Sequence, residues 1–248
     1  MPGRGQPRAL RPVRYGVARV ISKLGLTSRT AAAALVRAGR VQVNGRVVLD
    51  PEFPMRQGVD RVTVDGKGAV AAARVVLMLN KPRGLVTTAR DEQGRATVYQ
   101  CLAGADLPWL APVGRLDKAS EGLLLFSNDP AWAARLNAPA SGPDKTYHVH
   151  IDQLPSAQLL QRLVHGVVAD GERLRAKAAR SLRSGARHSW LEVVLDEGRN
   201  RQIRRLLEAC GVATLRLVRV RIGSLSLGAL AKGKWRLLSE QEIAVLST

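Results

Sequence analysis

Residues 114–129 read GRLDKASEGLLLFSND, and they join a charged loop to a short apolar run. The run at residues 123–126 is too short and too apolar for a surface helix, so it predicts a strand buried on both faces. The loop with Arg115 and Asp117 would then lie at the rim of a core. A rigid sheet and partial burial make such side chains candidates for chemistry. Spacing alone favours a simpler interpretation, an ion pair between Arg115 and Asp117 that closes the loop.

The charge balance points to a polyanionic partner. The 248 residues contain 39 Lys and Arg against 20 Asp and Glu, a net charge of +19, and nucleic acid is the commonest polyanion. Residues 1–49 contribute ten of these cations and no acid. A chain of this length buries one sizeable core and leaves residues for a small extra module, so two domains are expected.

Cysteine usage and hydropathy bear on the compartment. Cys101 and Cys210 lie far apart and form no Cys-x-x-Cys motif, which fits core packing in a reducing compartment. No segment approaches the roughly 18 consecutive apolar residues of a membrane helix, and no apolar core of a secretory signal follows the basic start. A soluble, cytoplasmic protein without membrane contact is expected. The alternative, an organelle transit peptide, fits less well, because Ser is absent before Ser22.

The N-terminal part predicts a disordered arm and a small basic domain. Residues 1–13 hold three Pro, two Gly and three Arg, a composition typical of disorder. The domain is expected over residues 14–69, with a first helix that ends at Gly25 and a second that Ser28 caps and Gly39 ends. The residues expected to face inward are Val17, Val20, Ile21 and Leu24 in the first helix, and Ala31, Ala34, Leu35 and Ala38 in the second.

A hairpin is expected at residues 41–48, because the Asn44-Gly45 pair supplies the positive φ values that its turn needs. Residues 61–64 predict a further strand, and the domain boundary is expected near residue 70. With Ser28-Arg29, AGRV at residues 38–41 and VNG at residues 43–45, this region resembles the S4 RNA-binding module. The RNA contacts that the resemblance implies are Arg19, Lys23, Ser28, Arg29, Arg37 and Arg40. The alternative is a basic, solvated helical hairpin without a special role.

Residues 70–248 predict a larger α+β domain, whose mixed, largely antiparallel sheet is flanked by helices. In the strand at residues 145–151, Tyr147 should face the core while His148 and His150 face away, and Arg219 and Arg221 should share a face of the strand at residues 215–222. The other strands are expected at residues 74–79 and 123–126 and within residues 166–196. Helices are expected after Asp129-Pro130, after Ser156 and after residues 197–200.

Four motifs follow one another in this domain: KPRG at residues 81–84, GRLD at 114–117, KTY at 145–147 and EGRNRQIRR at 197–205. Each is weak alone. In this order, behind an S4-like module, they closely resemble the pseudouridine synthases of the small-subunit rRNA and related single-site type, over roughly residues 14–238. The resemblance implies isomerisation of one uridine in ribosomal RNA by a monomer that needs no metal or other cofactor.

The resemblance also implies catalytic roles. Asp117 would be the catalytic carboxylate, a nucleophile or base towards the ribose or the uracil. Tyr147 would stack on the flipped uracil and help to move the proton of carbon 5. Arg204 would pair with Asp117 and keep it ionised.

The resemblance further implies residues that bind the substrate. Extrusion of the base costs roughly a few kcal/mol, and Arg115 would stabilise the space that the base leaves. Ile203 would pack beside the pair of Asp117 and Arg204. The remaining implied contacts are Lys81 and Arg201, although the KPRG motif would mainly hold its strand in place.

Taken singly, these residues have simpler explanations. Tyr147 would be a core residue, Arg204 a solvated helix charge, and His148 with His150 strand histidines rather than metal ligands, since no third ligand is at hand. The departures from the family pattern are Ser120 where Thr is frequent, Pro130 in place of Gly, and Asn137-Ala138-Pro139 without the frequent His.

Two other functional classes stay open. A non-catalytic RNA-binding protein of ribosome assembly with the same fold would share the composition, but it has no need to keep Asp117, Tyr147 and Arg204 together. A glycosidase with paired carboxylates is less well supported, because only Asp117 of the opening stretch is backed by the other motifs.

Overall fold

A computed structural model of the chain describes residues 14–56, 58–139 and 141–246. Contacts divide the chain into two compact units, the first ending at Ala73 and the second beginning at Arg74, and each has hydrophobic clusters of its own. The arm predicted at residues 1–13 lies outside the described residues.

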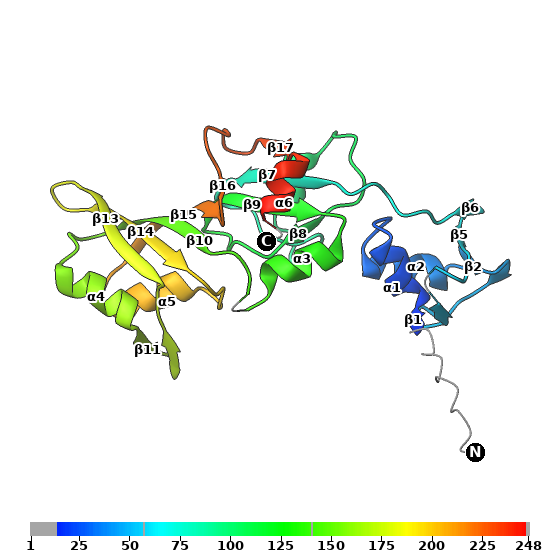
Figure 1. Cartoon of the computed structure of the whole chain (residues 1–248), viewed down its shortest axis with the longest axis horizontal. Helices are drawn as coiled ribbons and strands as arrows, with labels where there is room; N and C mark the ends of the chain where they lie inside the picture. The colour runs from blue at the N-terminus through cyan, green and yellow to red at the C-terminus, as the bar shows by residue number, and fades with distance from the viewer. Residues whose placement is uncertain (1–13, 57, 140, 247–248) are drawn as a thin grey trace, which may run out of the picture. The chain divides into compact units, whose positions relative to one another are not determined.

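The first unit joins two short helices to small antiparallel sheets (Figure 1). Helix α1 (Val17–Lys23) buries the apolar face that its spacing predicted. Asn44 and Gly45 adopt φ values of +51° and +79°, which confirms the hairpin predicted around them. Its strands are β2 (Val41–Val43) and β3 (Arg46–Val47), the same sheet continues with β5 (Val62–Val64) and β6 (Lys67–Gly68), and β1 (Arg14–Gly16) pairs with β4 (Pro54–Arg56).

The inward face predicted for the second helix is wrong by one position. Helix α2 (Arg29–Arg37) is capped by Ser28, whose Oγ accepts a hydrogen bond of 3.0 Å from the Ala31 amide. Its buried residues are Ala32 and Val36, whereas Ala31, Ala34 and Ala38 are exposed and Leu35 is half-buried. A run of four alanines carries no hydrophobic contrast, so the larger Val36 decides which face turns inward.

The second unit is built on a nine-stranded sheet with the order β13-β14-β10-β15-β9-β7-β17, to which β8 and β16 pair at β9 and β15. Its strand pairs are antiparallel except β9 with β15, which confirms the mixed, largely antiparallel sheet. The bounds are β7 (Val76–Lys81), β8 (Ala111–Val113), β9 (Glu121–Ser127), β10 (Lys145–Ile151), β13 (Ala178–Ser184), β14 (Ser189–Leu195), β15 (Thr214–Ile222), β16 (Leu225–Ser226) and β17 (Trp235–Leu237).

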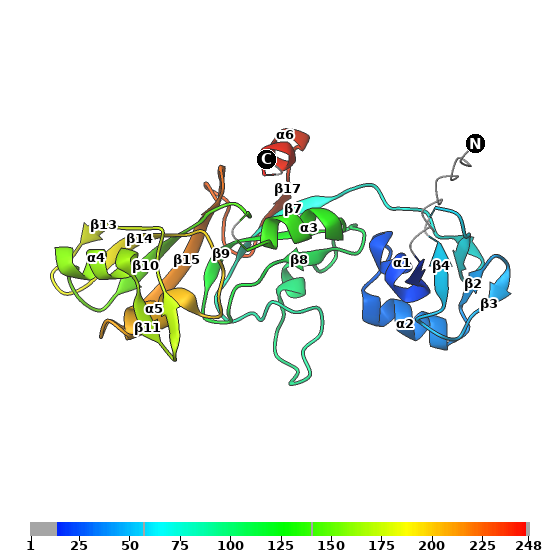
Figure 2. The ribbon, with the colours of Figure 1, turned by 60° about the horizontal axis from the view of Figure 1, so that its bottom comes forward.

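Helices cover parts of both faces of this sheet (Figure 2). On one face of β7 and β9, residues such as Leu123 and Leu125 pack with Trp132 and Ile243 of α3 and α6. The other face packs against α4 and α5. Every residue of β9 is buried, as predicted for a strand that is covered on both faces. The bounds are η1 (Val98–Leu102), α3 (Pro130–Asn137), α4 (Ala157–His165), α5 (Gln202–Glu208) and α6 (Glu240–Val245), and the separate hairpin comprises β11 (Val167–Ala169) and β12 (Glu172–Leu174).

Gly122 allows the parallel contact between β9 and β15. It has a φ of +98°, and a Cβ built on it would lie 2.2 Å from the carbonyl oxygen of Arg219. Glycine is therefore required here both by conformation and by the close approach of two backbones. This contact joins the halves of the sheet directly after the charged loop.

The prediction that Arg219 and Arg221 share a face is wrong. Arg219 is paired with Tyr147 and Arg221 with Thr146, because the register shifts at this point of the β10–β15 ladder. The extra residue breaks the alternation of side chains. Arg219 stays on the core side with Leu217 and is only 5% exposed, while Arg221, which follows the register shift, is exposed.

None of the helices within the described ranges is long and apolar enough to span a membrane.

Candidate active site

The loop that bears Asp117 lies between β8 and β9 and is held from below by Lys81. This lysine ends β7, is fully buried, and donates hydrogen bonds from Nζ to the carbonyls of Pro82, Asp117 and Ser120 at 3.2, 3.1 and 2.7 Å. Thr87 adds a bond of 2.7 Å from its hydroxyl to the Leu116 carbonyl. Several backbone groups of the loop are therefore fixed before any substrate binds.

The expected contact of Lys81 with substrate is not supported. Its ammonium group has no exposed surface and its donors point at main-chain carbonyls. Burial lowers the pKa of Lys81 to about 8, although the charges of Asp117 and Glu121 act in the opposite direction. Lys81 therefore orders the loop, as the expected structural role of the KPRG motif requires.

A cleft of about 540 Å³ opens above this loop and brings together five of the residues predicted as a site: Arg115, Asp117, Tyr147, Arg201 and Ile203. Asp117 is half-buried and Arg115 exposed. The two form no ion pair within 4.0 Å, so the loop is not closed in the way that spacing alone favoured. The guanidinium of Arg115 is therefore available to a substrate that enters the cleft.

Tyr147 lies in the floor of the cleft, with 8% of its surface exposed. Strand β10 places it on the core side with Val149 and Ile151, while His148 and His150 lie on the other side, as the alternation predicted. The neighbouring β15 sets Arg219 beside it in register. An aromatic ring at the bottom of a cleft suits stacking on a base.

Arg204 lies beside the cleft but does not form the predicted ion pair with Asp117. Its Nη1 and Nη2 donate hydrogen bonds of 3.2 Å to the carbonyls of Thr214 and Ala119, respectively, and its Nε is buried without a partner among the described residues. The guanidinium of Arg204, on α5, reaches the backbone of the Asp117 loop and not the carboxylate. The carbonyl of Ala119 therefore accepts the hydrogen bond that was expected for Asp117.

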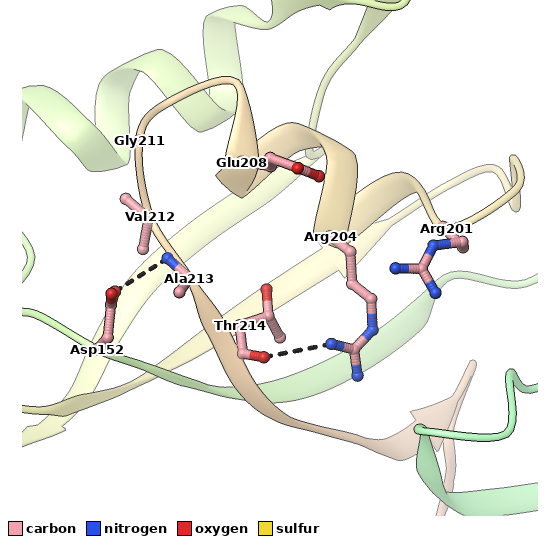
Figure 3. Close-up of a pocket in the computed structure, with 8 residues that line it drawn as sticks. All are labelled: Asp152, Arg201, Arg204, Glu208, Gly211, Val212, Ala213 and Thr214. Carbon is pink, nitrogen blue, oxygen red and sulfur yellow. Dashed lines mark hydrogen bonds between the residues drawn. The ribbon is translucent and has the colours of Figure 1, made fainter.

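Arg204 is nevertheless electrically coupled to the site. Burial lowers its pKa, the charge of Arg201 lowers it further, and Asp117 raises it. Arg204 and Arg201 also line an adjoining hollow of about 440 Å³. Figure 3 shows this hollow, with the hydrogen bond from Arg204 to the Thr214 carbonyl on one side and the bond from the Ala213 amide to Asp152 on the other. Arg201 lines both this hollow and the cleft. Cations from α5 thus border the Asp117 loop.

Arg219 is a residue of the cleft that the sequence did not reveal. Its Nε donates a hydrogen bond of 2.7 Å to the Leu123 carbonyl, and its Nη2 is buried without a partner among the described residues. Lys145 also lines the cleft, and burial, together with the charge of Arg219, lowers its pKa. Alternation with the apolar Leu217 is the signal that could have placed Arg219 on the core side, because the bulge lies after Arg219 and changes only the direction of Arg221.

In the first unit, the six residues predicted to contact RNA occupy several environments. Arg19 and Lys23 lie over the ring of Tyr15 at 5.0 and 4.1 Å. Arg29 pairs with Glu52 and Arg40 with Asp65, Arg37 is exposed on α2, and Ser28 caps that helix. Their contacts with RNA remain a prediction.

Among the described residues, no group of three or more His, Cys, Asp or Glu side chains is arranged to hold a metal ion. His148 lies 3.6 Å from Glu192 and His150 stacks on Trp190. Cys101 and Cys210 are free and half-buried.

A carboxylate-bearing loop beside a tyrosine in a cation-rich cleft fits one class of protein, the enzymes that modify nucleotides within nucleic acids. Residues 75–209 match the RNA pseudouridylate synthase family and residues 17–60 match the S4 domain. The chain therefore belongs to the RNA pseudouridylate synthase family, and its activity is the isomerisation of uridine to pseudouridine in RNA.

Individual relatives agree with this assignment. A ribosomal large subunit pseudouridine synthase B of Bacillus subtilis is 35% identical over 228 residues, which cover 91% of this chain and 92% of the relative. A protein of the same name in Pseudomonas aeruginosa is also 35% identical, over 95% of this chain and 62% of its own length. A crystal structure of a pseudouridylate synthase superposes with a TM-score of 0.64 at 28% identity and covers 94% of this chain and 99% of its own.

Proposed function

We propose that this enzyme isomerises one specific uridine of ribosomal RNA, with Asp117 as its catalytic carboxylate. Relatives that are named ribosomal large subunit pseudouridine synthase B support ribosomal RNA as the substrate. The observation that carries the catalytic role is the position of Asp117: it lines the same cleft as Tyr147, on a loop whose carbonyls are bound by a buried lysine.

The reaction requires three changes in the substrate. The bond between the ribose and nitrogen 1 of uracil must break, the uracil must turn, and a bond from carbon 5 to the ribose must replace it while carbon 5 loses its proton. Asp117 serves as the nucleophile or base that starts this sequence. Tyr147 supports the turned uracil, and its hydroxyl assists the transfer of the proton.

The remaining cleft residues bind and orient the RNA. Arg115 is exposed at the loop and takes the space that the flipped nucleotide leaves. Arg201 contacts phosphate at the edge of the cleft, and Ile203 packs against the loop of Asp117. Arg204 stabilises the ionised Asp117 through its charge and through the bond to Ala119 rather than through a direct pair.

We further infer that residues 14–69 act as an S4-like RNA-binding domain in front of the catalytic domain at residues 70–248. Its substrate contacts are Arg19, Lys23, Ser28, Arg29, Arg37 and Arg40. The enzyme works in the cytoplasm as a monomer that uses no cofactor. Sedimentation of the free enzyme tests the monomer, and activity after treatment with a chelator tests the independence of metal.

Release of tritium from ribosomal RNA that carries 5-tritiated uridine tests the reaction. Asp117→Asn should lower the release rate by at least about 10³-fold, the scale of a lost nucleophile or base, while the affinity for RNA is kept. The matched control is Asp106→Asn, because Asp106 is exposed and lies outside the cleft. Release by Asp117→Asn at the rate of the native enzyme would reject Asp117 as the catalytic carboxylate. Absence of release from both the native enzyme and Asp117→Asn would favour a protein that only binds RNA.

A further inference from the structure

The sheet of the second unit carries a row of basic and aromatic side chains on the face opposite to Tyr147. Arg183, Trp190, His150 and Arg216 pair in register across β13, β14, β10 and β15. The tertiary structure thus assembles one continuous row, which we call the rear row, from four separate stretches of chain. Its neighbours along the strands include the half-exposed residues Val218 and Val220.

Stacking preorganises the rear row. The rings of His150 and Trp190 lie 4.9 Å apart at an interplanar angle of 12°, and His188 meets His150 edge-on at 5.5 Å. The guanidinium carbons of Arg183 and Arg216 lie 5.2 and 5.8 Å from the centroid of the Trp190 ring. Guanidinium groups held over an aromatic ring lose little conformational freedom when their N–H groups bind an anion.

The charges around the rear row are predominantly positive. Glu192 is neutralised by Arg180 at 2.7 Å and approached by His148, and the buried Glu121 is shared by Arg216 and Lys232. Arg183 and the exposed Arg187 form no ion pair with any described residue. Burial, His188, Arg183 and Arg216 together hold the pKa of His150 below its usual value, as expected where positive charge accumulates.

Two hollows flank Trp190. One of about 360 Å³ is bounded by His150, Trp190 and the β13–β14 turn with Arg187 and His188. The other, of about 380 Å³, has Leu182, Val218 and Val220 in its lining beside Arg183 and Arg216. Cations beside hollows that share an aromatic wall at Trp190 match the alternation of phosphates and bases along a single strand of RNA.

We propose that the rear row is a second RNA-binding surface, which holds a single-stranded segment of the substrate RNA distant from the target uridine. Arg183 and Arg187 contact its phosphates, and the hollows beside Trp190 accommodate its bases. The inference rests on the proposed function only in taking a long RNA as the substrate. The surface lies on the opposite side of the sheet from Asp117 and Tyr147, so it contributes affinity and orientation without taking part in the chemistry.

The test compares two double variants that remove equal charge. Arg183→Gln/Arg187→Gln removes the unpaired cations of the rear face, and Arg162→Gln/Arg173→Gln removes two exposed cations from α4 and β12, which belong to the layer on the other side of the sheet. Affinity is measured by filter binding against salt, for complete ribosomal RNA and for a short fragment around the modified uridine.

For the complete RNA, the rear-face variant should bind at least about fivefold more weakly near 0.1 M salt, and its slope of log affinity against log salt should be shallower by about 1.4, as for two lost contacts on a single strand. The fragment, which lacks the distant segment, should bind both variants and the native enzyme equally. Trp190→Phe keeps a ring and His150→Gln removes one, so His150→Gln should weaken binding of the complete RNA more than Trp190→Phe.

Native affinity and slope in the rear-face variant would overturn the proposal, as would an equal loss in the control variant, which would show only an effect of net charge. Self-association of the native enzyme that the rear-face variant abolishes would assign the surface to a second copy of the chain instead. Tritium release from the fragment separates this result from the proposed function, because it depends on Asp117 and should be normal in both double variants.

Discussion

At the scale of the residue, Arg204 contacts the loop of Asp117 through the main chain and not through the carboxylate. Its guanidinium binds the carbonyl of Ala119, two residues after Asp117, and the carbonyl of Thr214 on β15. The charge of Asp117 raises the pKa of Arg204 against the effect of burial. The arginine therefore joins α5, the Asp117 loop and β15 at one point.

Replacement of Arg204 separates its charge from its geometry. We expect Arg204→Met to lower kcat by about 10²-fold or more with a small change in KM, since in the proposed mechanism the charge of Arg204 acts on the reaction at Asp117 rather than on the binding of RNA. Arg204→Lys keeps the charge but not the two directed hydrogen bonds, so its kcat should lie between that of the native enzyme and that of Arg204→Met. Tritium release measures all three, and equal rates for Met and Lys variants would contradict a role for the charge.

Lys81 is the second residue whose burial has measurable consequences. Lys81→Met should lower the free energy of unfolding by about 3 kcal/mol, because three main-chain carbonyls lose their donor. The neighbouring Lys118→Met is the control, since Lys118 is exposed. Urea unfolding measures both, and a difference of less than about 1 kcal/mol between them would show that the carbonyls find other partners.

The lowered pKa of Lys81 also predicts how stability depends on pH. Its pKa is about 8 in the folded protein and 10.5 in the reference state. Below pH 8 both states are protonated and the cost of burying the charge is complete; between pH 8 and 10.5 the unfolded chain binds more protons, so stability rises with pH. The free energy of unfolding of the native enzyme, minus that of Lys81→Met, should therefore increase over this range. Parallel pH curves for the two proteins would contradict the assignment.

At the scale of the element, the parallel contact of β9 with β15 connects the Asp117 loop to the rest of the sheet. It depends on Gly122, where any Cβ would meet the backbone of Arg219. The same backbone places Arg219 beside Tyr147. A change at Gly122 should therefore reach the floor of the cleft.

We expect Gly122→Ala to lower the free energy of unfolding by about 3 kcal/mol or more, as strain from the clash adds to the cost of positive φ, and to lower activity at temperatures where the protein stays folded. Gly104→Ala is the matched control, because Gly104 also has a positive φ, +76°, but has open space around its missing Cβ. It should cost only about 1 kcal/mol. Thermal unfolding and tritium release measure both, and equal losses would show that the close approach is not what requires glycine.

At the scale of the whole molecule, charge dominates the encounter with RNA. A net charge of +19 predicts that affinity for RNA falls by roughly 10³-fold between 50 and 200 mM salt, because phosphate contacts release counterions. Filter binding over this range measures the effect, and Asp117→Asn should follow the same line as the native enzyme. An affinity that is flat with salt would contradict a mainly electrostatic mode of binding.

Local patterns in the sequence determined much of this protein. The burial of β9, the inward face of α1, the Asn44-Gly45 turn and the core side of Tyr147 each follow from the periodicity or the turn chemistry of a few neighbouring residues. The motif around Asp117 and the motif that begins at Glu197 indicated the family, which the comparisons confirmed. Such local patterns can be read from the sequence without knowing which segments pair in the sheet.

The tertiary structure decided the features that depend on pairing between distant segments. The bulge between β10 and β15 turns Arg221 away from the face of Arg219, the three carbonyls around Lys81 bury its ammonium group, and the position of α5 gives Arg204 the carbonyl of Ala119 instead of the carboxylate of Asp117. The rear row likewise exists only because four strands meet in one register. Register and bulges are set by the energy of the assembled sheet, and no single stretch of sequence contains that information.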